Sequence, residues 1–184
     1  MKIFFSTLSI LLLIYMVWPG PTTIAQFPPL PNAEKSKLEG DTIQVSNVSA
    51  YFSDNFREFA TNFYRKNYQT LSGFPFPPIT LNHPPEYSWN VIKRHTDSTY
   101  LEEFVYPLRD SIYVNGLELF YQDGTPKFWG ITKFELGEKK YFTKVTLRFF
   151  PSQLLPRILV WIGIIISLVF LFSLAKKILF EKYE

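Results

Sequence analysis

The feature that most constrains this chain of 184 residues is an apolar run near its C-terminal end, Leu154–Ala175. An α-helix rises about 1.5 Å per residue and the hydrocarbon core of a bilayer is about 30 Å thick, so about 20 apolar residues are enough to cross it. A core helix of a soluble protein usually has a polar stripe, whereas Trp161, Ile164 and Phe172 spread apolar groups around this helix. We therefore predict a transmembrane helix over these residues.

The basic residues after this run set its expected orientation. Lys176, Lys177 and Lys182 lie in the short tail formed by residues 176–184. An excess of Lys and Arg beside a membrane span marks the cytoplasmic side. We expect a cytoplasmic tail at the cell membrane, with the bulk of the chain, ahead of the span, outside the cytoplasm.

Residues 1–25 resemble a secretory signal. Lys2 is followed by an apolar stretch up to Trp18, and the small residue Ala25 could precede a cleavage point. The alternative is an uncleaved anchor, although the sixteen residues of this stretch reach only about 24 Å as a helix. We favour the signal peptide. Both interpretations place Gln26 outside the cytoplasm, and they differ in whether the mature chain crosses the membrane once or twice.

The charge and the cysteine content exclude several classes of protein. The net charge is +3, yet residues 26–153 carry fourteen basic and fourteen acidic side chains, so the surplus lies beside the membrane segments. A nucleic-acid partner therefore loses its main support. The chain has no cysteine, which excludes disulfides and thiolate zinc sites, and we expect no cofactor.

The first part of the soluble region predicts a tether and then a helix. Residues 26–50 are rich in proline and charge, as in an extended tether, with one short strand near the end. Residues 53–69 have helical periodicity, with Ser53, Asp54 or Asn55 as the cap. The predicted buried face consists of Phe56, Phe59, Ala60, Phe63 and Asn67. The proline-rich stretch 71–85 should then wrap over this helix.

The remainder, up to residue 153, predicts strands. We expect three hairpins, with turns at residues 96–98, at Asn115–Gly116 and at Gly137–Glu138, and a further turn at 122–126. The last strand, 140–150, alternates between apolar and polar residues. The sequence therefore predicts an α+β domain over 51–153, in which one amphipathic helix packs on an antiparallel sheet built from hairpins.

Candidate contact residues fall into three groups. Exposed aromatic side chains on the hairpins could stack on a sugar or a protein, although such residues are more often buried in the core. Arg109, next to Asp110, fits an ion pair that locks a turn, or a clamp for a ligand carboxylate. In the predicted span, Gly163 and Ser167 are small residues four positions apart, a spacing that allows another helix to approach closely. These candidates are Trp89, Tyr100, Tyr121, Trp129, Gly163 and Ser167.

We expect a membrane-anchored, non-enzymatic interaction or accessory protein whose domain is held close to the bilayer by the short link at 151–156. Its partners would be the lipid bilayer and another membrane protein. The alternative is a carbohydrate-binding module of the cell envelope that uses Trp89 or Trp129. A third hypothesis is an enzyme with a site near His95, Asp97 and Glu103, although no catalytic motif occurs.

Overall fold

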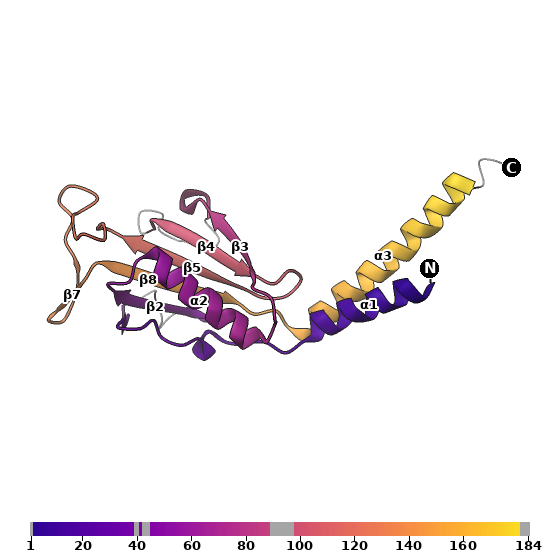
Figure 1. Cartoon of the computed structure of the whole chain (residues 1–184), viewed down its shortest axis with the longest axis horizontal. Helices are drawn as coiled ribbons and strands as arrows, with labels where there is room; N and C mark the ends of the chain where they lie inside the picture. The colour runs from indigo at the N-terminus through magenta and orange to yellow at the C-terminus, as the bar shows by residue number, and fades with distance from the viewer. Residues whose placement is uncertain (1, 39–40, 42–44, 89–97, 181–184) are drawn as a thin grey trace. The chain divides into compact units, whose positions relative to one another are not determined.

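The computed structural model describes residues 2–38, 41, 45–88 and 98–180 (Figure 1). The chain divides into two compact units. One is the folded domain, Gly20–Pro151, and the other contains Met1–Pro19 and Ser152–Glu184.

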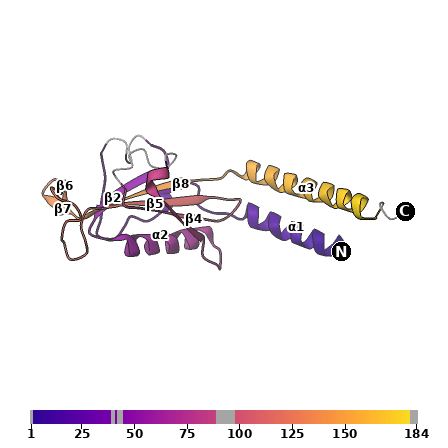
Figure 2. The same ribbon diagram turned by 90° about the horizontal axis from the view of Figure 1, so that it is seen from above.

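The folded domain is an antiparallel sheet with the helix α2 (Arg57–Ser72) on one face, as Figure 2 shows. Within the described part of the chain the main sheet has six strands in the order β1-β2-β8-β5-β4-β3, and a separate hairpin pairs β6 with β7. The strands are β1 (Glu34–Lys35), β2 (Val48–Ser53), β3 (Ile79–His83), β4 (Tyr100–Val105), β5 (Ser111–Glu118), β6 (Phe134–Leu136), β7 (Lys139–Tyr141) and β8 (Thr143–Phe150). Every neighbouring pair is antiparallel. The predicted α+β class is confirmed.

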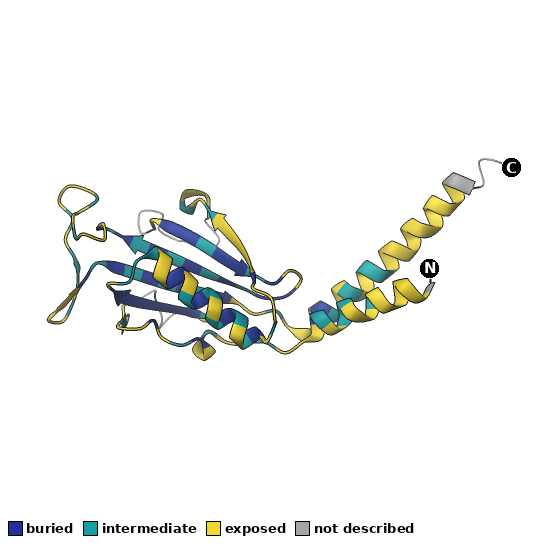
Figure 3. Cartoon of the chain, viewed as in Figure 1, coloured by how far each residue is buried: buried dark blue, intermediate teal, exposed yellow. Residues whose placement is uncertain are grey.

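The two central strands, β5 and β8, have the period of two that a half-buried strand requires. Residues along both strands alternate between buried and intermediate exposure (Figure 3). The predicted alternation is confirmed over β8, where Val145, Leu147 and Phe149 are all buried, whereas residues 139–141 form the separate strand β7 instead of the start of one strand over 140–150. They join Tyr64 and Tyr68 of α2 in one hydrophobic core.

The helix α2 exists as predicted, but its buried face is different. Its buried residues are Ala60, Thr61, Tyr64, Tyr68 and Ser72. Phe59, predicted to be buried, is 49% exposed and stacks on Phe63. The buried face is thus shifted by roughly 100°, which is one residue step around a helix. The rotation buries Tyr68 where its hydroxyl can donate to the carbonyl of Asp110 at 2.6 Å, so the polar group has a partner in the core.

The predicted cap of α2 is wrong. Ser53 is the last residue of β2, where its hydroxyl lies 3.0 Å from that of Thr143. The N-cap position is taken by Phe56, which has no capping side chain, and the backbone N–H of Arg57 donates to the carboxylate of Glu118 instead. A distant strand therefore caps the helix.

The predicted hairpin turn at Asn115–Gly116 is also wrong, because β5 runs straight through both residues. Neither has a positive φ. A Cβ on Gly116 would overlap the ring of Tyr100, which lies opposite it on β4. The glycine is needed to make room for an aromatic ring. The hairpin joining β4 to β5 turns at residues 106–110 instead, where Arg109 N–H donates to the carbonyl of Tyr106 at 3.0 Å.

The remaining strand predictions have mixed outcomes. The hairpin at Gly137–Glu138 and the turn at 122–126 are confirmed, with positive φ at Gly137 and Gly124. Between the turn at 122–126 and Gly137, residues 134–136 form a strand, β6. Within the proline-rich stretch 71–85, residues 79–83 form the edge strand β3, which pairs with β4. The first half of the first predicted hairpin and its turn lie at 89–97, outside the described residues.

The segment expected to be a tether belongs to the folded domain. Phe27 and Leu30 are buried in the core, and β1 pairs with β2. Large apolar side chains between the prolines explain the difference, since burial of one such side chain stabilises a fold by about 1.5–3 kcal/mol.

The second unit contains two helices, α1 (Lys2–Val17) and α3 (Leu154–Phe180). Among the described helices, α3 alone is long and apolar enough to cross a membrane, over Leu154–Ile178. Arg157, near its start, is buried. Its guanidinium donates to the carbonyl of Met16 at the end of α1, a contact that the sequence did not predict.

The close approach of Gly116 to Tyr100 gives a test of the fold. Gly116→Ala should lower the free energy of unfolding by about 1–3 kcal/mol, because the added methyl overpacks the core. The loss should be smaller in a Tyr100→Leu background, where the ring is absent. Urea unfolding of the four chains in detergent, followed by circular dichroism, measures both effects. An equal loss in the two backgrounds would contradict this packing.

Candidate functional site

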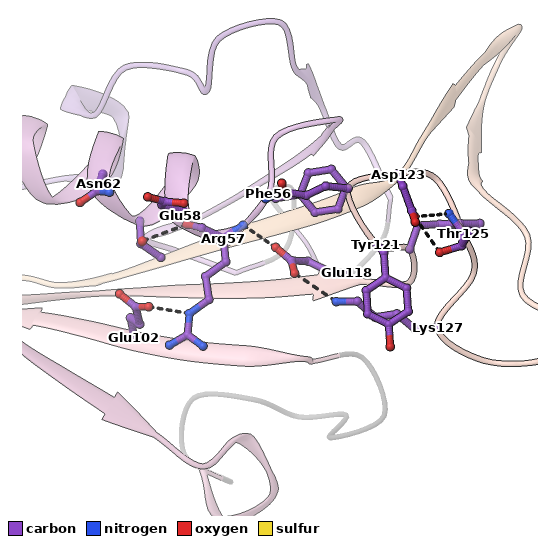
Figure 4. Close-up of a pocket in the computed structure, with 13 residues that line it drawn as sticks. Phe56, Arg57, Glu58, Asn62, Glu102, Glu118, Tyr121, Asp123, Thr125 and Lys127 are labelled. Atoms are coloured by element: carbon purple, nitrogen blue, oxygen red, sulfur yellow. Dashed lines mark hydrogen bonds and ion pairs between the residues drawn. The ribbon is translucent and has the colours of Figure 1, made fainter.

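An open cleft of about 980 Å³ lies beside the first turn of α2. Its walls are the start of α2, side chains of β4 and β5, and the turn that follows β5. The residues that line it include Phe56, Arg57, Glu58, Glu102, Glu118, Tyr121, Asp123 and Lys127 (Figure 4). Charged groups of both signs thus share one surface with three aromatic rings, those of Phe56, Phe120 and Tyr121.

The central carboxylate of the cleft is that of Glu118, which is almost fully buried. One of its oxygens accepts from the backbone N–H of Arg57, and the other lies 3.3 Å from Nζ of Lys127 (Figure 4). A carboxylate at a helix N-terminus satisfies a free N–H and interacts well with the helix dipole. The Arg57 side chain pairs with Glu102 at 2.7 Å. Most of the charge in the cleft is therefore already neutralised.

The turn beside the cleft is held by Asp123. Its carboxylate accepts from the backbone N–H of Thr125 at 2.9 Å and from the Thr125 hydroxyl at 2.6 Å. The two hydrogen bonds, with the hydroxyl bond the stronger influence, lower the pKa of Asp123 below its ordinary value. The turn also has a backbone hydrogen bond from Gly124 N–H to the carbonyl of Tyr121. These hydrogen bonds make the turn a rigid base for the residues after Thr125.

Residues 119–133 form a long loop between β5 and β6, which we call the Trp129 loop. Its base is pinned by ring contacts: Phe120 packs edge-on against Phe142 at 5.3 Å, and Nζ of Lys133 lies 3.9 Å from the centre of the same ring. A hydrogen bond from Lys127 N–H to the carbonyl of Leu119 closes the first part of the loop. Both ends of the loop are thus fixed to the domain.

The tip of the Trp129 loop, in contrast, is exposed to solvent. Trp129 is fully exposed, Phe128 is 59% exposed, and Tyr121 at the base is 55% exposed. A Cβ on the neighbouring Gly130 would meet nothing within 4 Å. Large aromatic side chains in contact with water are costly in a folded protein, and they are enriched in the surfaces through which proteins bind others.

The other predicted contact residues have different positions. Tyr100 is only 3% exposed and belongs to the core. Arg109 is buried too, with its Nε 3.6 Å from the carboxylate of Asp110, which is the geometry of the predicted turn-locking pair. Trp89 lies outside the described residues.

Gly163 and Ser167 lie on an exposed part of α3. A Cβ on Gly163 would meet nothing within 4 Å, apart from its own stretch of helix. The α1 helix contacts a different face of α3, the one that carries Arg157 and Trp161. Pairing of the Gly163 face with another helix stays a prediction.

The structure describes only part of the enzyme site that the third hypothesis predicts. His95 and Asp97 lie outside the described residues. Glu103 is buried, and its carboxylate lies 2.8 Å from Nε2 of His83, a pair that sequence reasoning did not find because β3 was not expected there. Burial, followed by the nearby charge of Glu103, raises the pKa of Tyr113 to about 12. Among the described residues no three His, Asp or Glu side chains are grouped as metal ligands.

Sequence reasoning missed the network around Glu118. The contact between Glu118 and α2 joins residues that are 61 positions apart, and no local pattern shows it. Comparisons with protein-family models, with curated proteins and with solved structures found no match to this chain. The function is therefore argued from the site itself.

Glu118 gives a test of the cleft. Glu118→Gln should lower the free energy of unfolding by about 1–2 kcal/mol, because the cap of α2 and the pair with Lys127 lose their charge. Glu138→Gln, at an exposed turn, is the matched control and should change it by less than about 0.5 kcal/mol. Urea titration of both variants measures the difference. Equal stability of the two variants would show that Glu118 does not hold the helix.

Proposed function

We propose that this chain is a membrane-anchored, non-enzymatic interaction protein that binds a partner protein through the Trp129 loop. The observation that carries the proposal is the contrast within this loop, whose base is pinned by Phe120 and Lys133 while Trp129 is fully exposed. A rigid base reduces the entropy that the tip loses when a partner binds it.

The energy available at the tip is large enough for this role. An aromatic side chain buries about 150–250 Å² when it is covered, and about 25 cal/mol is gained per Å², so one ring contributes roughly 4–6 kcal/mol before any costs. Trp is among the residues that dominate binding energies in protein interfaces. Phe128 adds a second exposed ring beside it.

The anchor in this proposal is α3, which is long and apolar enough to cross a membrane. Lys176 and Lys177 at its C-terminal end favour the cytoplasmic side for that end, so we place the folded domain outside the cytoplasm. Three residues, 151–153, join β8 to α3, and so short a link keeps the domain close to the bilayer.

The cleft supports a non-enzymatic role. Glu102 and Glu118 are paired with Arg57 and Lys127. A general acid or base must exchange a proton with a substrate, whereas these carboxylates serve to hold α2 and the loop. Tyr121 lines the cleft and would extend the surface through which this chain contacts the partner.

Carbohydrate binding is the second candidate, because the full exposure of Trp129 also suits stacking on a sugar ring. The two candidates separate in one experiment. A glycan array probed with the purified chain should give no signal that depends on Trp129 if the partner is a protein. A sugar bound by the native chain and not by Trp129→Ala would replace our proposal with this alternative.

The main test is affinity purification from membranes in mild detergent. The native chain should bring down a partner protein, and Trp129→Ala should lose it while changing the free energy of unfolding by less than about 0.5 kcal/mol, since the ring has no folded neighbour. Phe59→Ala is the control, because Phe59 is another exposed aromatic residue, 49% exposed, but lies on α2, and this variant should retain the partner. A native chain that is recovered alone and monomeric would count against the proposal.

A further inference from the structure

The two helices of the second unit are joined by polar contacts along the first part of α3. At the start of α3, Arg157 donates from Nη1 to the carbonyl of Met16 at 3.3 Å and from Nη2 to that of Ser152 at 2.8 Å. One turn further on, the indole N–H of Trp161 donates to the carbonyl of Ser9 at 3.0 Å. Met16 has no exposed surface. The α1 helix thus pairs with α3 through specific hydrogen bonds.

The contact of Arg157 has a specific physical reason. The α1 helix ends at Val17, so the carbonyl of Met16 is one of the last four in the helix and lacks an intrahelical donor. A cation at a helix C-terminus is also favoured by the helix dipole. Beside an apolar membrane phase, an unsatisfied carbonyl or guanidinium would cost several kcal/mol. Arg157 therefore supplies a donor for the free carbonyl of Met16, and that carbonyl supplies an acceptor for the guanidinium.

The chain that follows α1 is part of the folded domain. Pro21 is buried, and Ile24 packs on the core. Residues Ile24–Gln26 form a 3-10 turn, in which the Gln26 side chain accepts from the backbone N–H of Thr22 at 2.6 Å and from that of Thr23 at 3.2 Å. The bond after Ala25, which the sequence suggested as a cleavage point, lies within this turn.

We propose that the N-terminal helix is not removed as a signal peptide but stays in the mature protein, where it pairs with α3 as a two-helix membrane hairpin. Both ends of the chain then lie on the cytoplasmic side, in agreement with Lys2 at one end and Lys176 and Lys177 at the other. Sixteen residues span only about 24 Å, and pairing with a longer helix is one way to accommodate a short span. This inference rests on the membrane anchor of the proposed function, but it does not depend on binding through the Trp129 loop.

The direct test is the intact mass of the native chain purified from membranes. Retention predicts the whole chain of 21.6 kDa, beginning at or next to Met1. A mature chain that begins at Gln26 would overturn the proposal.

Cross-linking tests the pairing itself. The chain has no cysteine, so pairs can be introduced cleanly. The Ser9→Cys/Trp161→Cys variant joins the two contacting positions, and Ser9→Cys/Gly163→Cys is the matched control, since Gly163 lies away from α1. A short membrane-permeable bismaleimide should form the intramolecular link several-fold more in the first variant. Equal yields in the two variants would overturn the pairing.

Discussion

The ion pair of Arg109 and Asp110 joins three parts of the chain that are distant in sequence. Both side chains are fully buried, and the guanidinium also lies 4.8 Å from the ring centre of Phe74. Tyr68 of α2 donates to the carbonyl of Asp110, and Gly20 approaches so closely that a Cβ there would lie 2.7 Å from Nη2 of the arginine. Breaking a buried pair by removing one partner costs about 3–5 kcal/mol, so this contact fixes α2 and the N-terminal segment on the sheet. It lies at the end of β5 where β8 stops, so both connections to the helices of the second unit leave the folded domain from the same end.

Sequence patterns predicted the parts of the fold that depend on local periodicity. The alternation over 140–150 and the helical period over 53–69 gave a strand and a helix, and together they gave the fold class. They failed where a distant residue decides the local structure. Asn115–Gly116 is a strong turn signal, yet the glycine makes room for Tyr100 within a strand. The cap of α2 comes from Glu118, and no pattern near the helix could show it.

The candidate site was predictable to a smaller extent. An aromatic side chain in a hairpin region is ambiguous, because core and surface positions have the same residue types. Trp129 and Tyr121 proved to be exposed, whereas Tyr100 is part of the core. The pinning of the loop by Phe120 and Phe142 depends on a contact between two segments that sequence reasoning treated separately. The pairing of α1 with α3 was missed for the same reason, since Arg157 and Met16 are 141 positions apart in the sequence.

Our central proposal is that the Trp129 loop of the folded domain binds a partner protein while α3 anchors the chain in the membrane. The loop follows Glu118, at the end of β5 opposite the one where Pro151 leads into the second unit. A chain whose single tryptophan is Trp129, with Trp18, Trp89 and Trp161 each replaced by Phe, can be reconstituted into vesicles for fluorescence quenching. Aqueous acrylamide should quench Trp129 strongly, and brominated lipids should leave it unchanged. Quenching by the lipids, with protection from acrylamide, would show that the loop inserts into the membrane and would contradict this account.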